Sequence, residues 1–247
     1  MVRTIAYGPS PEQVGDLWLP DGDGAGGNGF PVVAIWHGGG FVAEVTRVIM
    51  EGLAADLRDH GIAAWNLEYR RNGSGGGWPQ TFADAADGLD RLASLDAPVD
   101  LARVATLGFS AGGPVSLWAA GRGDAAVRPV AAVSQAGVVD LDRVARDDGT
   151  DCRVVELLGD PDERREDYAR ANPAERLPLG VPLLLVHGDA DENVPLEMQR
   201  EFCRRATAAG DDVELRVIPG ATHFAHNDPR SEAWRAAREW LQAALGA

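Results

Sequence analysis

One serine of this chain stands in a setting that favours nucleophilic chemistry. Residues 108–112 read Gly-Phe-Ser-Ala-Gly and directly follow the apolar run 103–107. The pattern predicts a buried strand, a sharp turn and a helix that begins at once, with glycine at both ends of the turn because a Cβ atom there would crowd the chain. Such a turn holds the Ser110 hydroxyl beside a helix N-terminus, whose N–H groups favour developing negative charge. We therefore predict that Ser110 is a nucleophile, while a solvated serine in a tight turn remains the alternative.

Two later segments supply groups that could activate this serine. Residues 187–195 read His-Gly-Asp-Ala-Asp-Glu-Asn-Val-Pro, and residues 220–224 read Gly-Ala-Thr-His-Phe; each follows an apolar run. Open α/β sheets place their sites at the C-terminal ends of strands, so these segments are expected to meet the serine. Histidine can take up and return a proton near neutral pH, and a carboxylate behind it fixes its tautomer. We predict His223 as general base and acid and Asp191 as its orienting carboxylate.

Both assignments have a competing neighbour. Asp189 competes with Asp191, and His226 competes with His223. The spacing His-Gly-x-x-Asp-x-x-Val-Pro favours Asp191, and Gly-x-x-His after a strand favours His223. Asp189 would otherwise cap a turn, and His226 would sit on the following loop.

A glycine-rich segment, residues 37–41, reads His-Gly-Gly-Gly-Phe and also follows an apolar run. Glycine lets the main chain approach the oxygen of a tetrahedral intermediate. We predict an oxyanion hole formed by the backbone N–H groups of Gly39, Gly40 and Ala111, in which one donor is worth ~3 kcal/mol. His37 is expected to tie down the loop by hydrogen bonding.

Aromatic and charged residues surround these motifs in sequence. Three aromatic residues border the predicted site: Phe41, Trp78 and Phe224. They could line an acyl or aryl pocket, or they could simply pack. Glu68, Arg70 and Asp84 could bind substrate charge, but a partly buried ion-pair network that supports the glycine loop is favoured, because buried charges need partners.

Strands and helices alternate along the chain, which predicts an α/β fold with a parallel sheet covered on both faces. Strands are predicted at residues 4–7, 14–19, 31–36, 62–67, 103–109, 130–134, 182–186 and 213–218, and helices at 45–60, 81–95 and 231–245. Residues 137–179 are the least regular and have room for a small lid insertion, but not for a large lid. We expect a single domain over residues 1–247.

The ordered motifs from Trp36 to His223 resemble the α/β-hydrolase superfamily, esterase/lipase type, with its His-Gly-Gly-Gly oxyanion motif. The stretch 68–84 is similar to the family's Tyr-Arg…Pro…Asp pattern that braces the glycine loop, although the glycine run 73–77 departs from it. Sequences of this shape also resemble the kynurenine formamidase-like branch and small bacterial carboxylesterases. The resemblance implies an α/β-hydrolase fold with a mostly parallel eight-stranded sheet, a minimal lid and a Ser-Asp-His triad.

The composition limits the classes of partner and of chemistry that are expected for this protein. The chain has 247 residues and a net charge of −15, and all of its basic residues are arginine. Such acidity disfavours binding to nucleic acid and anionic membranes, and the absence of lysine removes Ser–Lys and Schiff-base chemistry.

The first thirty residues hold no signal segment and no apolar run is long enough to span a membrane, so we expect a cytoplasmic protein. A homodimer is compatible with the sequence. No cofactor or metal is expected, and Cys152 and Cys203 are expected to be unpaired thiols rather than a disulfide.

These observations predict a serine hydrolase that cleaves a small carboxylic ester through an acyl-enzyme. The minimal lid favours short-chain or aryl esters over long lipids. The alternatives are an arylformamidase that acts on an N-formylkynurenine-type amide, and an acyl-transfer or cyclising enzyme with the same triad. A single-domain peptidase is less favoured, because the sequence lacks a propeller domain.

Overall fold

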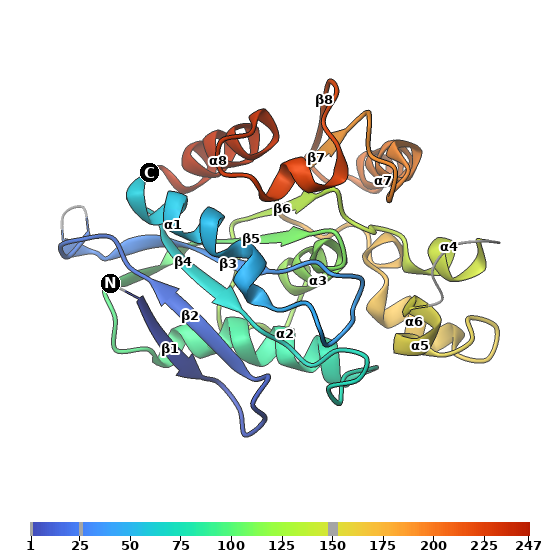
Figure 1. Ribbon diagram of the computed structural model, residues 1–247, viewed down its shortest axis with the longest axis horizontal. Coiled ribbons are helices and arrows are strands. Elements are labelled where there is room, and N and C mark those ends of the chain that lie inside the picture. Colours follow the sequence, from blue (N-terminus) through green and yellow to red (C-terminus); the bar gives the residue numbers. More distant parts are fainter. Residues whose placement is uncertain (1, 25–26, 148–152) are drawn as a thin grey trace.

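An eight-stranded sheet forms the centre of the molecule (Figure 1). The computed structural model describes residues 2–24, 27–147 and 153–247. The strands are β1 (Val2–Ala6), β2 (Val14–Trp18), β3 (Phe30–Trp36), β4 (Ala63–Leu67), β5 (Val99–Phe109), β6 (Ala131–Gln135), β7 (Leu183–Gly188) and β8 (Val213–Ile218). Their spatial order is β1-β2-β4-β3-β5-β6-β7-β8. The predicted eight-stranded α/β fold is confirmed.

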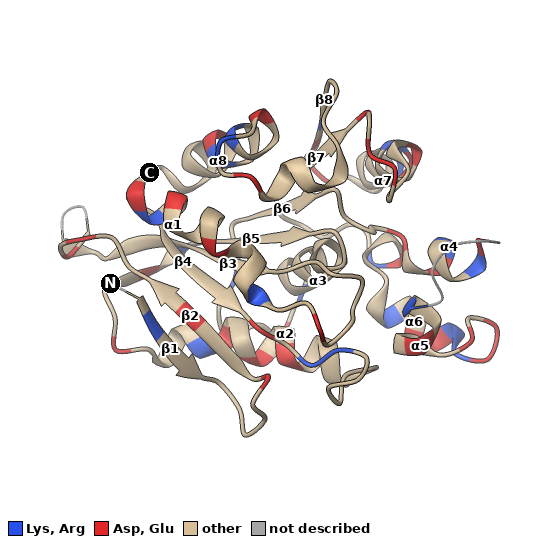
Figure 2. Ribbon diagram, in the orientation of Figure 1, with Lys and Arg blue, Asp and Glu red and all other residues tan. Residues whose placement is uncertain are grey.

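The sheet is parallel except at its N-terminal edge. β1 pairs antiparallel with β2, and β2 pairs antiparallel with β4. All other neighbours run parallel. Every residue of β3, β4, β6 and β7 is buried, as expected for parallel strands covered on both faces. Figure 2 shows charged residues on the surrounding helices and loops, whereas β3, β6 and β7 carry none.

Helices cover both faces of this sheet. They are α1 (Glu51–Asp59), α2 (Gln80–Asp90), α3 (Gly112–Ala120), α4 (Leu141–Arg146), α5 (Arg153–Leu158), α6 (Arg165–Ala171), α7 (Leu196–Ala209) and α8 (Glu232–Leu245). Among the described residues, short 3-10 helices also occur: η2 (Arg47–Met50), η3 (Arg91–Ser94), η4 (Pro173–Glu175) and η5 (His223–Asn227). Within β3, Val33 and Ile35 pack with α1 and α8, whereas Val32 and Ala34 pack with α2 and α3. This alternation follows from the two-residue period of a strand.

The helices differ from the sequence predictions in three places. The helix predicted over residues 45–60 begins as η2 and becomes α-helical only at Glu51, and the helix predicted over 81–95 ends as η3. Helix α7 was not predicted, although Met198, Phe202 and Ala206 form a buried stripe at four-residue spacing. The irregular interval 137–179 contains α4, the short helices α5 and α6, and η4.

Three further expectations concern membranes, metals and cysteines. Among the described residues, no helix is long and apolar enough to cross a membrane. The same part of the chain contains no group of three potential metal-ligating side chains. Cys152 lies outside the described residues. Cys203 lies on α7, where burial raises the pKa of its thiol to about 11.

Candidate active site

The serine lies on a turn that only glycine-flanked sequence permits. Strand β5 ends at Phe109 and α3 begins at Gly112, so Ser110 must turn the chain within two residues, and it does so with φ of 51°. A Cβ atom on Gly108 would lie 1.9 Å from the Gly112 oxygen, and one on Gly112 would lie 2.1 Å from the Trp36 oxygen. The backbone therefore requires both glycines, and the serine side chain is presented at the end of the strand.

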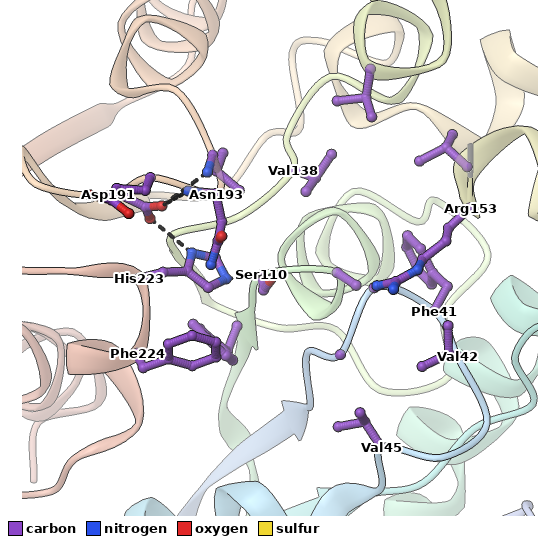
Figure 3. A pocket seen from close by; sticks show the side chains of 18 of the residues that line it. Phe41, Val42, Val45, Ser110, Val138, Arg153, Asp191, Asn193, His223 and Phe224 are labelled. Atoms are coloured by element: carbon purple, nitrogen blue, oxygen red, sulfur yellow. Dashed lines mark hydrogen bonds and ion pairs between the residues drawn. The ribbon is translucent and has the colours of Figure 1, made fainter. Parts of the chain in front are cut away.

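Ser110, His223 and Asp191 form a continuous chain of hydrogen bonds. Ser110 Oγ lies 3.0 Å from His223 Nε2, and His223 Nδ1 lies 2.8 Å from Asp191 Oδ2 (Figure 3). In a neutral imidazole, Nδ1–H donates to the carboxylate and Nε2 accepts from the serine hydroxyl. All three side chains are buried or nearly so. The arrangement can therefore move the serine proton onto the histidine.

The Asp191 carboxylate is held in its ionised form. Burial alone would raise its pKa, but hydrogen bonds outweigh burial and lower the pKa below its usual value. The His223 ring contacts one carboxylate oxygen, and the N–H groups of Asn193 and Val194 donate to the other at 2.8 and 2.9 Å. Asp189 does not reach the imidazole in this way, because its Oδ1 accepts from Gly220 N at 2.6 Å.

The competing histidine lies behind the site rather than in it. His226 is fully buried on η5, with its ring 6.5 Å from that of Phe109 and 6.4 Å from that of His187. Neither of its ring nitrogens has a hydrogen-bond partner among the described residues. Burial, and then the neighbouring His187, lower its pKa to about 3. His187 itself donates from Nε2 to Val194 O at 2.9 Å, which braces the loop that carries Asp191.

The neutral state of His226 predicts a loss of stability in acid. The unfolded chain binds a proton on this residue near its ordinary value of 6.5, whereas the folded chain does so only near 3. The contribution of neutral His226 to the free energy of unfolding is therefore fully present above pH 6.5 and decreases as the pH drops toward 3. At pH 5 this group lowers the free energy of unfolding by about 2 kcal/mol relative to neutral pH.

Thermal unfolding at pH 7 and pH 5 tests this. In His226→Phe, the decrease in Tm between the two pH values should be smaller than in the wild type. His60→Ala is the control, because His60 is partly exposed at the end of α1 and should leave the decrease unchanged. A decrease of equal size in His226→Phe and the wild type would contradict the assignment.

The glycine loop faces the serine. Gly39, Gly40 and Ala111 line one cavity together with Ser110 and His223. Gly39 and Gly40 adopt φ of 105° and 61°, a region that favours glycine. Ala111 immediately precedes α3, where backbone N–H groups lack intrahelical partners. The two main-chain segments thus lie on the same cavity as the Ser110 hydroxyl, where backbone N–H groups can act as hydrogen-bond donors.

Buried charges brace the glycine loop from behind. The His37 ring contacts Gly38 O and Glu68 Oε1, each at 2.7 Å, and Tyr69 OH donates to His37 O at 2.8 Å. Arg71 forms an ion pair with Glu68 at the same point. His37 therefore anchors the loop and does not line the cavity that contains the serine.

A second ion pair supports the neighbouring segment. Arg70 Nη2 lies 2.6 Å from Asp84 Oδ1, and Gln13 Nε2 donates to the same oxygen at 2.7 Å. The cavity that contains Ser110 is not lined by Arg70, Asp84 or Glu68. Their positions agree with the supporting network that the sequence favoured over substrate binding.

The cavity above the serine has a volume of about 1080 Å³. Phe41 and Phe224 line it; Phe41 is buried, whereas Phe224 is 69% exposed at the cavity edge. Trp78 does not line this cavity, although the sequence offered it as a substrate-binding residue; for Trp78 the packing alternative holds. Its backbone N–H donates to Leu157 O, its ring packs edge-on against that of Phe82, and it lines a second cavity of about 410 Å³.

Part of the cavity wall carries no sequence motif, so the sequence alone does not identify it. Such residues include Val138, Val144, Arg153, Val154 and Met198. Four of them belong to the interval 137–179, in which no spacing pattern marks residues that face a site. Met198 belongs to the buried stripe of α7, which the helical period could have revealed.

The sequence of this chain is similar to that of known hydrolases. Residues 60–247 match the family described as the prolyl oligopeptidase family. A segment of 60 residues is 38% identical to a monoacylglycerol lipase of Mycolicibacterium smegmatis. That segment is 24% of this chain and covers only 21% of the lipase.

Solved structures extend the likeness to the whole chain. A truncated carbohydrate esterase from gut microbiota superimposes with a TM-score of 0.85 at 18% identity, over 100% of this chain and 97% of the esterase. A thermophilic esterase from Thermogutta terrifontis gives a TM-score of 0.78 at 20% identity, over 98% of this chain and 92% of that protein. At these identities the likeness establishes the fold.

Proposed function

Because this chain belongs to the prolyl oligopeptidase family and has the α/β-hydrolase fold, we propose that it is a serine hydrolase that cleaves small carboxylic esters. One observation carries the proposal: Ser110, His223 and Asp191 are joined by hydrogen bonds at the edge of an open cavity. A serine hydroxyl is a weak nucleophile until a base takes its proton, and this arrangement supplies the base.

The reaction follows from the positions of these groups. His223 Nε2 takes the Ser110 proton as Oγ bonds to the ester carbon, and the carbonyl oxygen becomes an oxyanion held by the N–H groups of the glycine loop and Ala111. The histidine then donates that proton to the departing alkoxide, which leaves as an alcohol. Water repeats the sequence on the acyl-enzyme, so that the acid is released and the serine hydroxyl is restored. Asp191 stabilises the imidazolium in each half of the reaction.

The cavity wall supports a small, largely apolar substrate. Val138, Val144, Val154 and Met198 supply apolar surface, and a cavity of about 1080 Å³ can enclose a short-chain or aryl ester. The names of three relatives point the same way, because one is a lipase and two are esterases. The family also includes peptidases by its description, so ester and amide cleavage must be compared directly.

A substrate panel tests the proposal. We expect kcat/KM for p-nitrophenyl acetate and butyrate to exceed that for N-formylkynurenine and for an aminoacyl-proline p-nitroanilide by at least about a hundredfold, because a phenolate leaves more readily than an amide nitrogen; a hundredfold corresponds to about 2.7 kcal/mol of transition-state stabilisation. Higher kcat/KM on the formamide would establish an arylformamidase instead. Higher kcat/KM on the anilide would establish a peptidase. Transfer of the acyl group to an added alcohol, measured as product, would reveal an acyltransferase.

A further inference from the structure

An exposed aromatic ring lies beside His223 at the edge of the cavity. Phe224 is 69% exposed and directly follows His223 on η5. Its ring meets the imidazole edge-on, with ring centroids 5.4 Å apart. Figure 3 shows both rings projecting side by side into the cavity, on the side of Ser110 away from Phe41. One exposed ring by itself is common on protein surfaces, so its neighbours decide what it can do.

Two further apolar side chains line the cavity at this end. Phe109 is buried, and its ring centroid lies 5.0 Å from that of His223. Ile49 of η2 lines the same cavity and is 37% exposed. The segment that follows Ile49 lies against the segment after η5, since a Cβ atom on Gly52 would be 3.5 Å from Pro229 Cδ. Three elements, β5, η2 and η5, therefore contribute apolar surface to the cavity wall beside the histidine.

The charges that line the cavity disfavour an anionic group at this end. Among the described lining residues, the charged ones besides the histidine are Asp147, Arg153, Asp191 and Glu192. Figure 3 shows Arg153 on the far side of Ser110, and Asp147 ends α4 in the same part of the chain. Beside the histidine, Glu192 directly follows the hydrogen-bonded Asp191 and adds negative charge. A neutral apolar group there avoids this charge and gains from contact with the apolar wall.

The position of the general base assigns this end of the cavity to the alcohol half of an ester. His223 Nε2 lies 3.0 Å from Ser110 Oγ and must protonate the leaving oxygen, so that oxygen departs toward the imidazole. In the proposed mechanism the carbonyl oxygen is directed to the glycine loop and Ala111. The group attached to the leaving oxygen therefore lies beside the Phe224 ring, and the acyl chain extends away from the histidine.

We propose that Phe224, with Ile49 and Phe109, forms an alcohol seat, which binds the leaving alcohol and selects esters whose alcohol carries a phenyl group or a similarly large apolar group. This inference rests on the proposed ester hydrolysis and names the alcohol half that it prefers. As the bond between the acyl carbon and the alcohol oxygen breaks, the proton on His223 Nε2 passes to that oxygen and the alcohol departs. The alcohol seat takes no part in bond making.

Two isomeric esters test which half of the substrate meets the ring. The phenyl group is on the alcohol half in 2-phenylethyl butyrate and on the acyl half in ethyl 4-phenylbutyrate; ethyl butyrate is the reference without a ring. Ethyl butyrate and 2-phenylethyl butyrate give the same butyryl-enzyme from two primary alcohols, so their kcat/KM values compare acylation alone. The wild type should prefer 2-phenylethyl butyrate to ethyl butyrate about 30-fold in kcat/KM, since even one methylene group in an apolar pocket is worth about 10–200-fold.

Substitutions in the alcohol seat should reduce this preference. Phe224→Ala should lower it about tenfold, largely through KM, because the ring contacts the alcohol half in the ground state and in the transition state alike. Phe224→Leu keeps an apolar side chain and should retain part of the preference, and Ile49→Ala should lower it by a smaller factor than Phe224→Ala. Val48→Ala is the matched control: Val48 precedes Ile49 on η2 and is 57% exposed, but it does not line the cavity, so the preference should stay unchanged.

The comparison of the three esters separates this role from a structural one. If Phe224→Ala only displaced His223, kcat/KM would fall by one factor on all three esters, and the intact preference would overturn the alcohol seat. A larger loss on ethyl 4-phenylbutyrate would place the ring on the acyl half and overturn it too.

The wild type distinguishes this inference from the proposed function. Hydrolysis of p-nitrophenyl butyrate without a preference for 2-phenylethyl butyrate over ethyl butyrate would overturn the alcohol seat and leave ester hydrolysis standing. Failure to hydrolyse any of these esters would overturn the proposed function itself, and the inference with it.

Discussion

Replacement of Ser110 by alanine should lower kcat on p-nitrophenyl butyrate by about a million-fold, because the nucleophile acts as a unit with its base and its loss removes the whole covalent route. The fold should survive, since the backbone bonds from Ser110 N to Gln135 O and from Gly113 N to Ser110 O do not involve the side chain. A Tm within a few degrees of the wild type checks this. Initial rates at saturating ester check the loss.

Covalent labelling gives an independent measurement of the same assignment. A fluorophosphonate should add one mass adduct to the intact wild-type protein and none to Ser110→Ala. His223 is unchanged in the variant, so reagent attack on another residue would persist there. An adduct of equal yield in both proteins, or near-normal turnover by the variant, would remove Ser110 from the mechanism.

Asp191→Asn should lower kcat about ten-thousand-fold while KM changes little. The amide would donate to His223 Nδ1, which favours the tautomer whose Nε2 carries the proton. That ring cannot accept the serine proton across the 3.0 Å contact with Ser110 Oγ. Steady-state kinetics on one p-nitrophenyl ester, with the Tm of each protein, are sufficient to measure the effect.

Asp189→Asn is the matched control, because it makes the same substitution two residues away. Asp189 accepts from the Gly220 backbone rather than from the imidazole, so we expect less than a tenfold loss in kcat and a decrease in stability of about 1 kcal/mol. If Asp189→Asn were the more damaging substitution, the two aspartates would have to exchange roles.

Features set by local sequence were predictable. Gly108 is required by a contact with Gly112, four residues away, and a strand that runs straight into a helix is visible as a short apolar run followed by small residues. Gly112 is required by the Trp36 oxygen on the neighbouring strand, but its place in the Gly-x-Ser-x-Gly motif marks it in the sequence. The meeting of Asp191 and His223 follows from a general rule, since both come directly after parallel strands whose ends share one edge of the sheet.

Features set by tertiary packing were not predictable. Trp78 is close to the site motifs in sequence, but its ring packs on Phe82 of α2, away from the catalytic cavity. Arg153 was missed because nothing in its own segment shows that Asn72, far away in the chain, holds it beside the glycine loop. Helix α7 is a different case, because its apolar period was present in the sequence.

The order of the strands makes turnover a sensitive report on partial unfolding. Strand β5, which ends directly before Ser110, pairs with β3 on one side and β6 on the other. The glycine loop follows β3, whereas Asp191 and His223 follow β7 and β8. Fraying of the sheet from either flank would thus separate one set of groups from the serine while most of the helices and strands remain intact. In a denaturant titration, ester hydrolysis should be lost before the far-ultraviolet circular dichroism signal.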